Sequence, residues 1–333
     1  MRRGVPGSPP PRPLGPARAV SVFAPASVAN FGVGFDALGA ALDGPGDVVT
    51  ARLVERAGVR IVKIVGDAGR LPLETRRNTA GAGALAVLEE FAGRGRFGFE
   101  LSIAKGLPIA SGLGSSAASA VAGAWAAALL LGVTDKRRLL RAVLMAEYAA
   151  DGAWHGDNVF PALLGGLQLV TGSDPASPPA PVGLPVPPRL RLVLVRPELE
   201  VATREARRVL PRHVSLRDHV RNAAAFAGLV AALGSGDLTA AGRYVSSDLI
   251  VEPARAPLVP GCAAVRAAME KAGALGVAFA GAGPSLLALC RAGVTPARVA
   301  EAGVAAFRKA GIAARARVHR IDTRGARVVR SLP

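Results

Sequence analysis

The sequence has few cysteines, which excludes two classes of protein. Cys262 and Cys290 are the only cysteines among 333 residues, so a small fold stapled by a disulfide framework is excluded. The two thiols also lack the paired spacing of zinc ligands. Both lie in apolar segments, which predicts buried free thiols and fits a reducing cytoplasm.

Aromatic residues are also scarce, at 4% of the chain. The net charge of +17 would suit a nucleic-acid-binding protein, but the positive residues are mostly scattered arginines with short clusters such as 136–138. Few rings are available to stack on bases. We therefore expect no nucleic-acid partner and favour a basic surface that attracts an anionic substrate. A non-catalytic basic RNA-binding protein stays as the alternative from another class.

The chain also lacks a convincing membrane span. The uncharged stretch 117–133 is shorter than the ~20 residues that cross a bilayer, and it is dominated by alanine. Arg2 and Arg3 are followed by no apolar core, so a secretory signal is not expected. These observations predict a cytoplasmic protein without a membrane partner.

Proline and glycine are plentiful and divide the chain. Residues 1–18 and 173–188 are crowded with proline, and we expect a disordered tail and a linker or surface loop there. The chain is long enough for two domains with their own cores. We therefore expect domains at 19–172 and 189–333.

Apolar periodicity predicts a mixture of strands and helices in both domains. The expected strands cover 19–23, 47–54, 59–65, 97–105, 166–171, 189–196, 277–280, 285–290 and 313–320. The expected helices cover 78–91, 117–133, 135–150, 203–210, 215–233, 237–247, 261–272 and 296–310. A glycine-rich turn is expected at 24–39 and a loop at 151–159. This pattern predicts an α+β protein.

The most informative stretch is the glycine turn at 107–118, between an expected strand and an expected helix. Gly112 and Gly114 permit positive φ and bring no Cβ atom toward a ligand. Ser115 and Ser116 supply hydroxyls where a helix N-terminus needs caps. Free backbone amides and the positive end of the helix dipole would then converge on one anion, typically a phosphate.

This turn differs from the common nucleotide-binding loops. No Gly-x-x-x-x-Gly-Lys-Ser/Thr motif occurs in the chain. A Gly-x-Gly-x-x-Ala match at 32–37 is weak evidence for a dinucleotide site, because it recurs at 81–86 without the expected acidic partner. The run Pro-x-x-x-Gly-Leu-Gly-Ser-Ser-Ala-Ala that starts at Pro108 instead resembles the phosphate-binding loop of the GHMP small-molecule kinases.

Phosphoryl transfer from a nucleotide also needs a divalent cation with oxygen ligands. Ser116 offers a hydroxyl at the end of the glycine turn. Glu147 is a carboxylate in a mostly apolar helical stretch, where a charge is costly unless it is paired. The two residues are the expected Mg²⁺ ligands, although Glu147 could instead face solvent at the edge of its helix.

Further motifs resemble the homoserine kinase family within the GHMP kinases. They are 25–39, His155-x-Asp157-Asn158-Val159, Thr203-x-x-x-Arg207, Glu252-Pro253-x-Arg255 through 261, and the turn 281–285. The resemblance implies a two-domain GHMP kinase fold, with an N-terminal domain like domain 2 of ribosomal protein S5 and a ferredoxin-like C-terminal domain. It also implies ATP-dependent phosphorylation of the L-homoserine hydroxyl in threonine biosynthesis. Phe31 and Ala202 depart from the family pattern without removing a polar role.

The resemblance implies roles for individual residues. Those facing the substrate are Asn30 and Asp36 for its ammonium, Arg207 and Arg255 for its carboxylate, and Asn158 with His155 for its hydroxyl. Those along ATP are Asn78, Lys105, Pro108, Ile109, Ala110, Ser111, Gly112, Leu113, Gly114, Ser115, Ser116, Ala117 and Ala118. The expected cofactors are ATP and Mg²⁺, and a homodimer is possible.

The expected catalytic residues are Asn158, Ser116, Glu147 and Asp157. Asp157 stands where some relatives have a general base. Phosphoryl transfer has a loose transition state, so positioning and charge neutralisation can supply most of the acceleration. We therefore hypothesise that Asn158 positions the hydroxyl and that no base is needed. A GHMP kinase for another small alcohol remains an alternative, although Arg207 and Arg255 argue against a neutral sugar.

Overall fold

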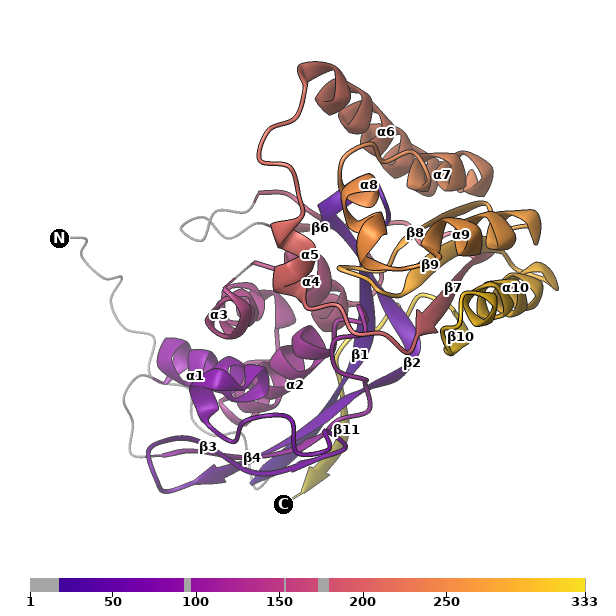
Figure 1. Cartoon of the computed structure of the whole chain (residues 1–333). Coiled ribbons are helices and arrows are strands. Elements are labelled where there is room, and N and C mark those ends of the chain that lie inside the picture. Colours follow the sequence, from indigo (N-terminus) through magenta and orange to yellow (C-terminus); the bar gives the residue numbers. More distant parts are fainter. Residues whose placement is uncertain (1–17, 93–96, 153, 173–179, 333) are drawn as a thin grey trace.

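The computed structural model describes residues 18–92, 97–152, 154–172 and 180–332, and two sheets organise them. The larger sheet has the order β11-β1-β2-β4-β3, with β5 paired to β2 and β6 paired to β5. The smaller sheet has the order β10-β7-β9-β8. Figure 1 shows the larger sheet with α1, α2 and α3 on one side of it, and the smaller sheet beside α9 and α10. The predicted tail 1–18 lies outside the described residues except for Arg18.

The strands of the larger sheet come from both ends of the chain. They are β1 (Ala19–Asn30), β2 (Gly34–Val54), β3 (Gly58–Val65), β4 (Gly98–Ala104), β5 (Leu167–Val170), β6 (Pro181–Leu184) and β11 (Arg327–Leu332). β11 pairs antiparallel with β1. It therefore covers an edge of the sheet that would otherwise present unpaired backbone groups.

β1 and β2 form one long antiparallel hairpin where the sequence predicted a glycine-rich turn over 24–39. The expectation was wrong because the small apolar residues of this stretch are buried strand residues, and the turn itself is confined to 31–33. Gly32 has φ +68°, and a Cβ there would meet the carbonyl oxygen of Val245 at 2.0 Å. The turn is thus tight because its glycine packs against the second half of the chain.

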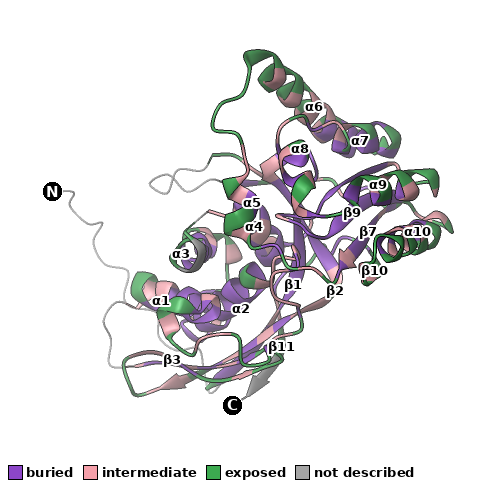
Figure 2. Ribbon diagram, in the orientation of Figure 1, coloured by how far each residue is buried: buried purple, intermediate pink, exposed green. Residues whose placement is uncertain are grey.

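Helices pack on the larger sheet and carry much of the pocket described below. They are η1 (Thr75–Arg77), α1 (Thr79–Phe91), α2 (Ser115–Leu130), η2 (Lys136–Leu139), α3 (Leu140–Asp151) and α4 (Gly156–Leu164). α2 is buried along nearly its whole length, as Figure 2 shows. Its alanine and glycine content allows close helix packing: a Cβ at Gly123 would meet the carbonyl oxygen of Ala80 in α1 at 2.3 Å.

The second half of the chain builds the smaller sheet. Its strands are β7 (Leu190–Pro197), β8 (Gly276–Phe279), β9 (Leu286–Arg291) and β10 (Ala314–His319). Its helices are α5 (Thr203–Arg208), α6 (Leu216–Ser235), α7 (Leu238–Val245), α8 (Val251–Arg255), η3 (Ala256–Leu258), α9 (Cys262–Lys271) and α10 (Thr295–Lys309). These elements match the predicted strands and helices closely, apart from α8 and η3, which the sequence analysis did not predict.

Three further differences concern loops and boundaries. The predicted loop 151–159 is only partly correct, because α4 begins at Gly156 and places Asp157 and Asn158 on a helix. The predicted Pro-rich loop 173–188 contains β6, and 173–179 lie outside the described residues. The predicted C-terminal domain, 189–333, sends β11 back to the larger sheet.

Both predicted free thiols are buried. Among the described residues, no helix is long and apolar enough to cross a membrane.

Candidate active site

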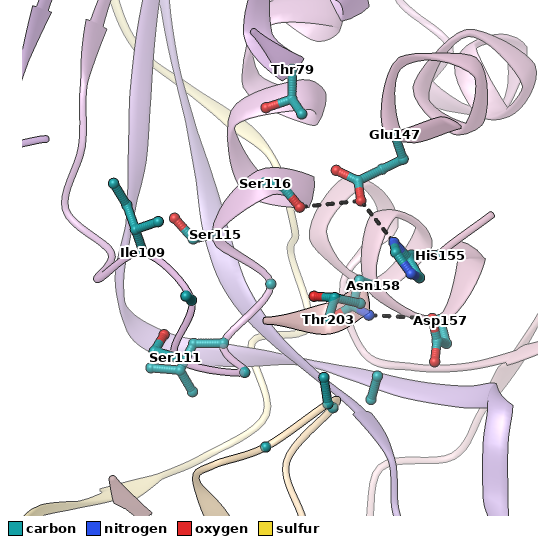
Figure 3. A pocket seen from close by; sticks show the side chains of 18 of the residues that line it. Thr79, Ile109, Ser111, Ser115, Ser116, Glu147, His155, Asp157, Asn158 and Thr203 are labelled. Atoms are coloured by element: carbon teal, nitrogen blue, oxygen red, sulfur yellow. Dashed lines mark hydrogen bonds and ion pairs between the residues drawn. The ribbon is translucent and has the colours of Figure 1, made fainter. Parts of the chain in front are cut away.

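A cavity of about 350 Å³ lies where the glycine turn meets the second half of the chain. Its lining includes the predicted site residues apart from Pro108, Ala117 and Ala118. Figure 3 shows Ser116, Glu147, His155, Asn158 and Asp157 on one side of it, opposite the turn with Ile109 and Ser111. The predicted residues thus come together at one place.

The glycine turn has the backbone that phosphate binding requires. Ala110, Gly112 and Gly114 have positive φ values of 54°, 76° and 60°. Gly114 is itself the N-cap of α2 and no side chain caps the helix, so the prediction that Ser115 and Ser116 act as caps was wrong. The first amides of a helix have no intrahelical acceptor, and the residues that begin α2, Ser115 and Ser116, line the cavity.

The two glycines also serve packing. A Cβ at Gly114 would meet Ser27 Oγ at 2.0 Å, and one at Gly112 would meet the carbonyl oxygen of Ala280 at 2.4 Å. Ser285 Oγ donates to the carbonyl oxygen of Ser111 at 2.7 Å. The turn is therefore clamped between the two halves of the chain.

Lys105 lies beneath the turn in a buried ion pair with Asp47. Its Nζ also donates to the carbonyl oxygen of Ser115 at 3.0 Å and to Ser119 Oγ at 2.8 Å. An ammonium has three donors, so these partners engage all of them. Asp47 Oδ1 accepts the amides of Gly106 and Leu107 at 3.0 and 3.2 Å. Lys105 thus braces the turn from inside the protein.

Glu147 of α3 is the carboxylate that the turn faces. Its side chain is 1% exposed, so the solvent-facing alternative is excluded. Glu147 Oε2 accepts Ser116 Oγ at 3.1 Å and lies 3.1 Å from His155 Nδ1. Its other oxygen, Oε1, is buried without a hydrogen-bond partner among the described residues. A buried, unpartnered carboxylate oxygen is costly and fits a cation that is bound together with a ligand.

His155 stabilises the negative charge on Glu147. Burial lowers the pKa of His155, but the hydrogen bond and charge of Glu147, together with the charge of Asp157, outweigh it and raise the pKa above its ordinary value. The imidazole therefore tends toward its charged form next to the carboxylate.

The donor set fits Mg²⁺ held largely by a substrate. Among the residues described, no group of three or more His, Cys, Asp or Glu side chains could hold a metal by itself. Ser116 and Glu147 offer one hydroxyl and one carboxylate, which suits an ion that keeps water and phosphate oxygens as its remaining ligands.

Asn158 and Asp157 begin α4 on the far side of the cavity. Asn158 Oδ1 accepts Ser27 Oγ at 3.0 Å, and Asn158 Nδ2 donates to Asp157 Oδ1 at 3.2 Å. These partners fix the orientation of the Asn158 amide. Asp157 is buried, and burial, followed by the charge of Asp36, raises its pKa to about 7, against the opposing effects of His155, Arg207 and the Asn158 hydrogen bond.

Opposite charges from the two halves of the chain face each other in the cavity. Arg207 Nη1 and Nη2 donate to the two carboxylate oxygens of Asp36 at 2.9 and 3.0 Å. Asn30 Oδ1 accepts the amide of Asp36 at 3.1 Å, and Asn30 Nδ2 donates to the carbonyl oxygen of Gly281 at 2.6 Å. Asn30 thereby holds Asp36 in its positive-φ conformation.

Arg255 is the second arginine in the part of the cavity that holds Asp36 and Arg207. It is buried, with Nη1 donating to the carbonyl oxygen of Gly281 at 2.9 Å and Nε donating to that of Ala206 at 3.2 Å. Burial and then the charge of Arg207 lower its pKa to about 10, so it stays charged at neutral pH. Phe35 lies against both guanidinium groups.

Two kinds of lining residue remain: Asn78, which was predicted to bind ATP, and residues to which the sequence analysis gave no role. Asn78 caps α1 by accepting the amide of Ala80 at 3.1 Å. The residues without a predicted role are Ala29, Phe35, Leu71, Arg77, Thr79, Ser119, Val201, Thr203, Gly281, Ala282 and Gly283. Ala29, Phe35, Thr203 and 281–283 lie inside quoted motifs, which is the one signal that marked them.

Comparisons with known proteins show which family this chain resembles. The family models "GHMP kinases N terminal domain" and "GHMP kinases C terminal" match residues 78–166 and 229–312. A homoserine kinase of Xylella fastidiosa (strain 9a5c) is 42% identical over 94% of this chain and 95% of its own. A homoserine kinase of Arabidopsis thaliana is 41% identical over 94% of this chain and 85% of its own. The crystal structure of a homoserine kinase from Cytophaga hutchinsonii has a TM-score of 0.88 and 40% identity, covering 94% of this chain and 98% of its own.

Proposed function

The chain belongs to the homoserine kinase family of the GHMP kinases, and from that premise we propose that it phosphorylates L-homoserine. It is a phosphotransferase with an alcohol acceptor, and its two-domain α+β GHMP kinase fold is the one expected from the sequence. The γ-phosphate of ATP is transferred to the side-chain hydroxyl of L-homoserine, as threonine biosynthesis requires.

The charge pair in the cavity is the strongest support for an amino-acid substrate. Asp36 and Arg207 neutralise each other when no ligand separates them. A zwitterion carries an ammonium for the carboxylate and a carboxylate for the guanidinium, so it can replace both halves of this contact. A neutral sugar offers neither an ammonium nor a carboxylate, so it could not replace either half of this contact.

ATP lies along the glycine turn in this proposal. The backbone of 108–118 and the N-terminus of α2 bind its phosphates. Asn78 and Lys105 lie along the nucleotide, Asn78 at the start of α1. Because the ammonium of Lys105 is engaged by Asp47, Ser115 and Ser119, backbone amides supply most of the phosphate contacts.

The amino acid lies at the opposite end of the cavity. Asp36 and Asn30 bind its ammonium, and Arg207 and Arg255 bind its carboxylate. Planar guanidinium groups are suited to this task because they donate two parallel hydrogen bonds.

Ser116 and Glu147 hold Mg²⁺ beside the phosphates. When bound, the ion neutralises charge on the phosphate oxygens. Glu147 keeps its orientation through Ser116 and His155.

Asn158 orients the reacting hydroxyl, and His155 lies next to it at the start of α4. Asp157 acts through Asn158, whose amide it fixes by a hydrogen bond of 3.2 Å. We propose that no general base is required, since in a loose transition state the new O–P bond is only slightly formed. Little positive charge then develops on the attacking hydroxyl, and its proton need not be removed early.

The proposal also covers the localisation, the assembly and the domain division of the protein. The enzyme works in the cytoplasm, with small-molecule substrates and with a homodimer as its possible assembly. We propose two domains, 19–172 and 189–333, joined by 173–188. β11 belongs to the second by sequence but completes the sheet of the first.

A substrate panel tests the function. ADP release is measured with ATP, Mg²⁺ and, in turn, L-homoserine, L-serine, mevalonate and galactose. We expect homoserine to give a kcat/KM at least tenfold above mevalonate and galactose, since one lost charged contact costs about this factor. The same margin is expected over L-serine, because its side chain is one methylene shorter and places the hydroxyl away from the phosphate. Equal or faster turnover of mevalonate or galactose would refute the assignment.

A further inference from the structure

Among the described residues, Phe35 is the one phenylalanine, tyrosine or tryptophan that lines the cavity. It lies in β2, directly before Asp36, and is half-buried. None of the roles assigned above involves its ring. A large apolar ring among charged groups is unusual unless it interacts with them.

Two guanidinium groups lie against this ring. The Cζ atoms of Arg255 and Arg207 are 5.1 and 5.6 Å from its centroid. Both distances fall within the ~6 Å at which an aromatic ring attracts a cation. The two arginines come from α5 and α8, and the ring from β2, so three elements meet at this contact.

The two arginines would otherwise repel each other. The charge of Arg207 is the second-largest influence that lowers the pKa of Arg255, after burial. Asp36 forms an ion pair with Arg207, whereas none of the ion pairs found among the described residues involves Arg255. The charges of Asp36, Asp157 and Asp248 offset the repulsion at Arg255 only in part, since its pKa is still lowered. The negative face of the Phe35 ring reduces the cost of holding both cations close together.

We propose that Phe35 is a positioning residue for carboxylate recognition: its ring holds the guanidinium groups of Arg207 and Arg255 at the spacing that binds the substrate carboxylate. The inference rests on the proposed function. Phe35 touches the arginines and acts through them, so it determines specificity for an α-amino acid over the corresponding amino alcohol.

The test compares Phe35→Leu with the wild type on two alcohols. L-Homoserine carries the carboxylate, whereas 3-aminopropan-1-ol has the same hydroxyl and ammonium without it. We expect Phe35→Leu to raise KM for homoserine about tenfold, the value of one cation–π contact, with kcat within about twofold. The kcat/KM for 3-aminopropan-1-ol, taken from initial rates below saturation, should stay within about twofold.

Two variants serve as controls. Phe35→Tyr keeps an aromatic face and should restore KM to within about threefold of the wild type. Phe23→Leu removes another half-buried ring, which lies on β1 outside the cavity. The centroid of that ring is 4.3 Å from Cζ of Arg327. This variant should leave both substrates unaffected. Phe35→Met replaces Phe35→Leu if thermal melting shows that the leucine variant does not fold.

The outcomes separate the inference from the function on which it rests. If the wild type does not phosphorylate homoserine, the proposed function fails before Phe35 is examined. If it does, and Phe35→Leu changes both alcohols equally or neither, Phe35 only fills space and the inference is wrong. A rise in KM for homoserine alone, which Phe35→Tyr does not show, supports the inference.

Discussion

The two ends of the cavity are built in different ways. The end that we propose for phosphate is lined by one contiguous stretch, 109–116, with Glu147 beside it. The amino-acid end consists of side chains from β2, α5 and α8, such as Asp36 and Arg207, which are 171 residues apart in the chain. Backbone recognition suits phosphate, which every nucleotide carries. Side-chain recognition suits the acceptor, which distinguishes one kinase from another.

This contrast predicts that the two ends affect different kinetic parameters. Groups beside the phosphates stabilise negative charge in the transition state, so their removal should lower kcat. Groups at the amino-acid end bind the substrate before and during the reaction and should change KM for homoserine.

The largest effect is expected from Glu147→Gln at the phosphate end. Loss of the carboxylate charge should lower kcat by about 10²–10³, as removal of one transition-state electrostatic contact does. The melting temperature should not fall, because a buried charge is removed. Steady-state ADP release and thermal melting measure both. Glu89→Gln, at an exposed glutamate of α1, is the matched control, and a kcat above about a tenth of wild type would contradict the Mg²⁺ role.

Arg255→Lys sharpens the comparison at the other end. Lysine keeps the charge but loses the planar fork, so KM for homoserine should rise about 10- to 100-fold. KM for ATP should stay unchanged. Arg298→Lys, at an exposed arginine of α10, is the control. An equal rise in both KM values would mean that the two ends are not separate.

Asp157→Asn tests whether the amino-acid end contributes chemistry. We expect kcat at pH 8 to remain within about tenfold of wild type, because asparagine still accepts the Asn158 hydrogen bond and general-base catalysis is typically worth 10²–10⁴. A loss of about 10³ with unchanged homoserine binding, measured by calorimetry, would establish a general base.

The same variant has a pH signature in stability. The pKa of Asp157 is raised from 3.8 to about 7, so the folded protein binds a proton between these values that the unfolded chain does not. The stability that this raised pKa contributes is complete below pH 3.8 and is lost progressively as the pH rises to about 7. The difference in melting temperature between Asp157→Asn and the wild type should therefore be more positive at pH 8 than at pH 5. The same difference at both values would contradict the raised pKa.

Ser285→Ala is the smallest of these perturbations and tests the clamp on the glycine turn. It leaves the buried carbonyl of Ser111 without its 2.7 Å hydrogen bond, which should destabilise the fold by about 1–3 kcal/mol. KM for ATP should rise about threefold, equivalent to ~0.7 kcal/mol. Ser235→Ala removes a similar hydroxyl-to-carbonyl bond on the exposed end of α6 and is the control. No change in the melting temperature would show that the clamp is unimportant.

Sequence reasoning was most successful where the information is local. The glycine turn, α1 and α2 depend on residues that are neighbours in the chain. The uncharged, alanine- and leucine-rich composition of 117–133 predicts a buried helix, and α2 is buried along nearly its whole length. Glu147 was also found locally, since a charge in an apolar helix needs a partner.

What the sequence could not reveal depends on tertiary contacts. The engagement of Lys105 needs Asp47, 58 residues earlier. The pairing of β11 with β1 and the helical start of Asp157 and Asn158 at α4 follow from packing that no local pattern records. Phe35 was quoted inside a motif, but its two arginine neighbours arrive from α5 and α8.

One strand connects both ends of the cavity. β2 carries Asp36 near its beginning and Asp47 further along, and these residues hold the amino-acid end and the base of the glycine turn. Removing a single residue between them would turn one carboxylate to the opposite face of the sheet. Descendants of this sequence should therefore gain or lose residues in surface loops such as 66–74, while the spacing between these two aspartates is inherited unchanged.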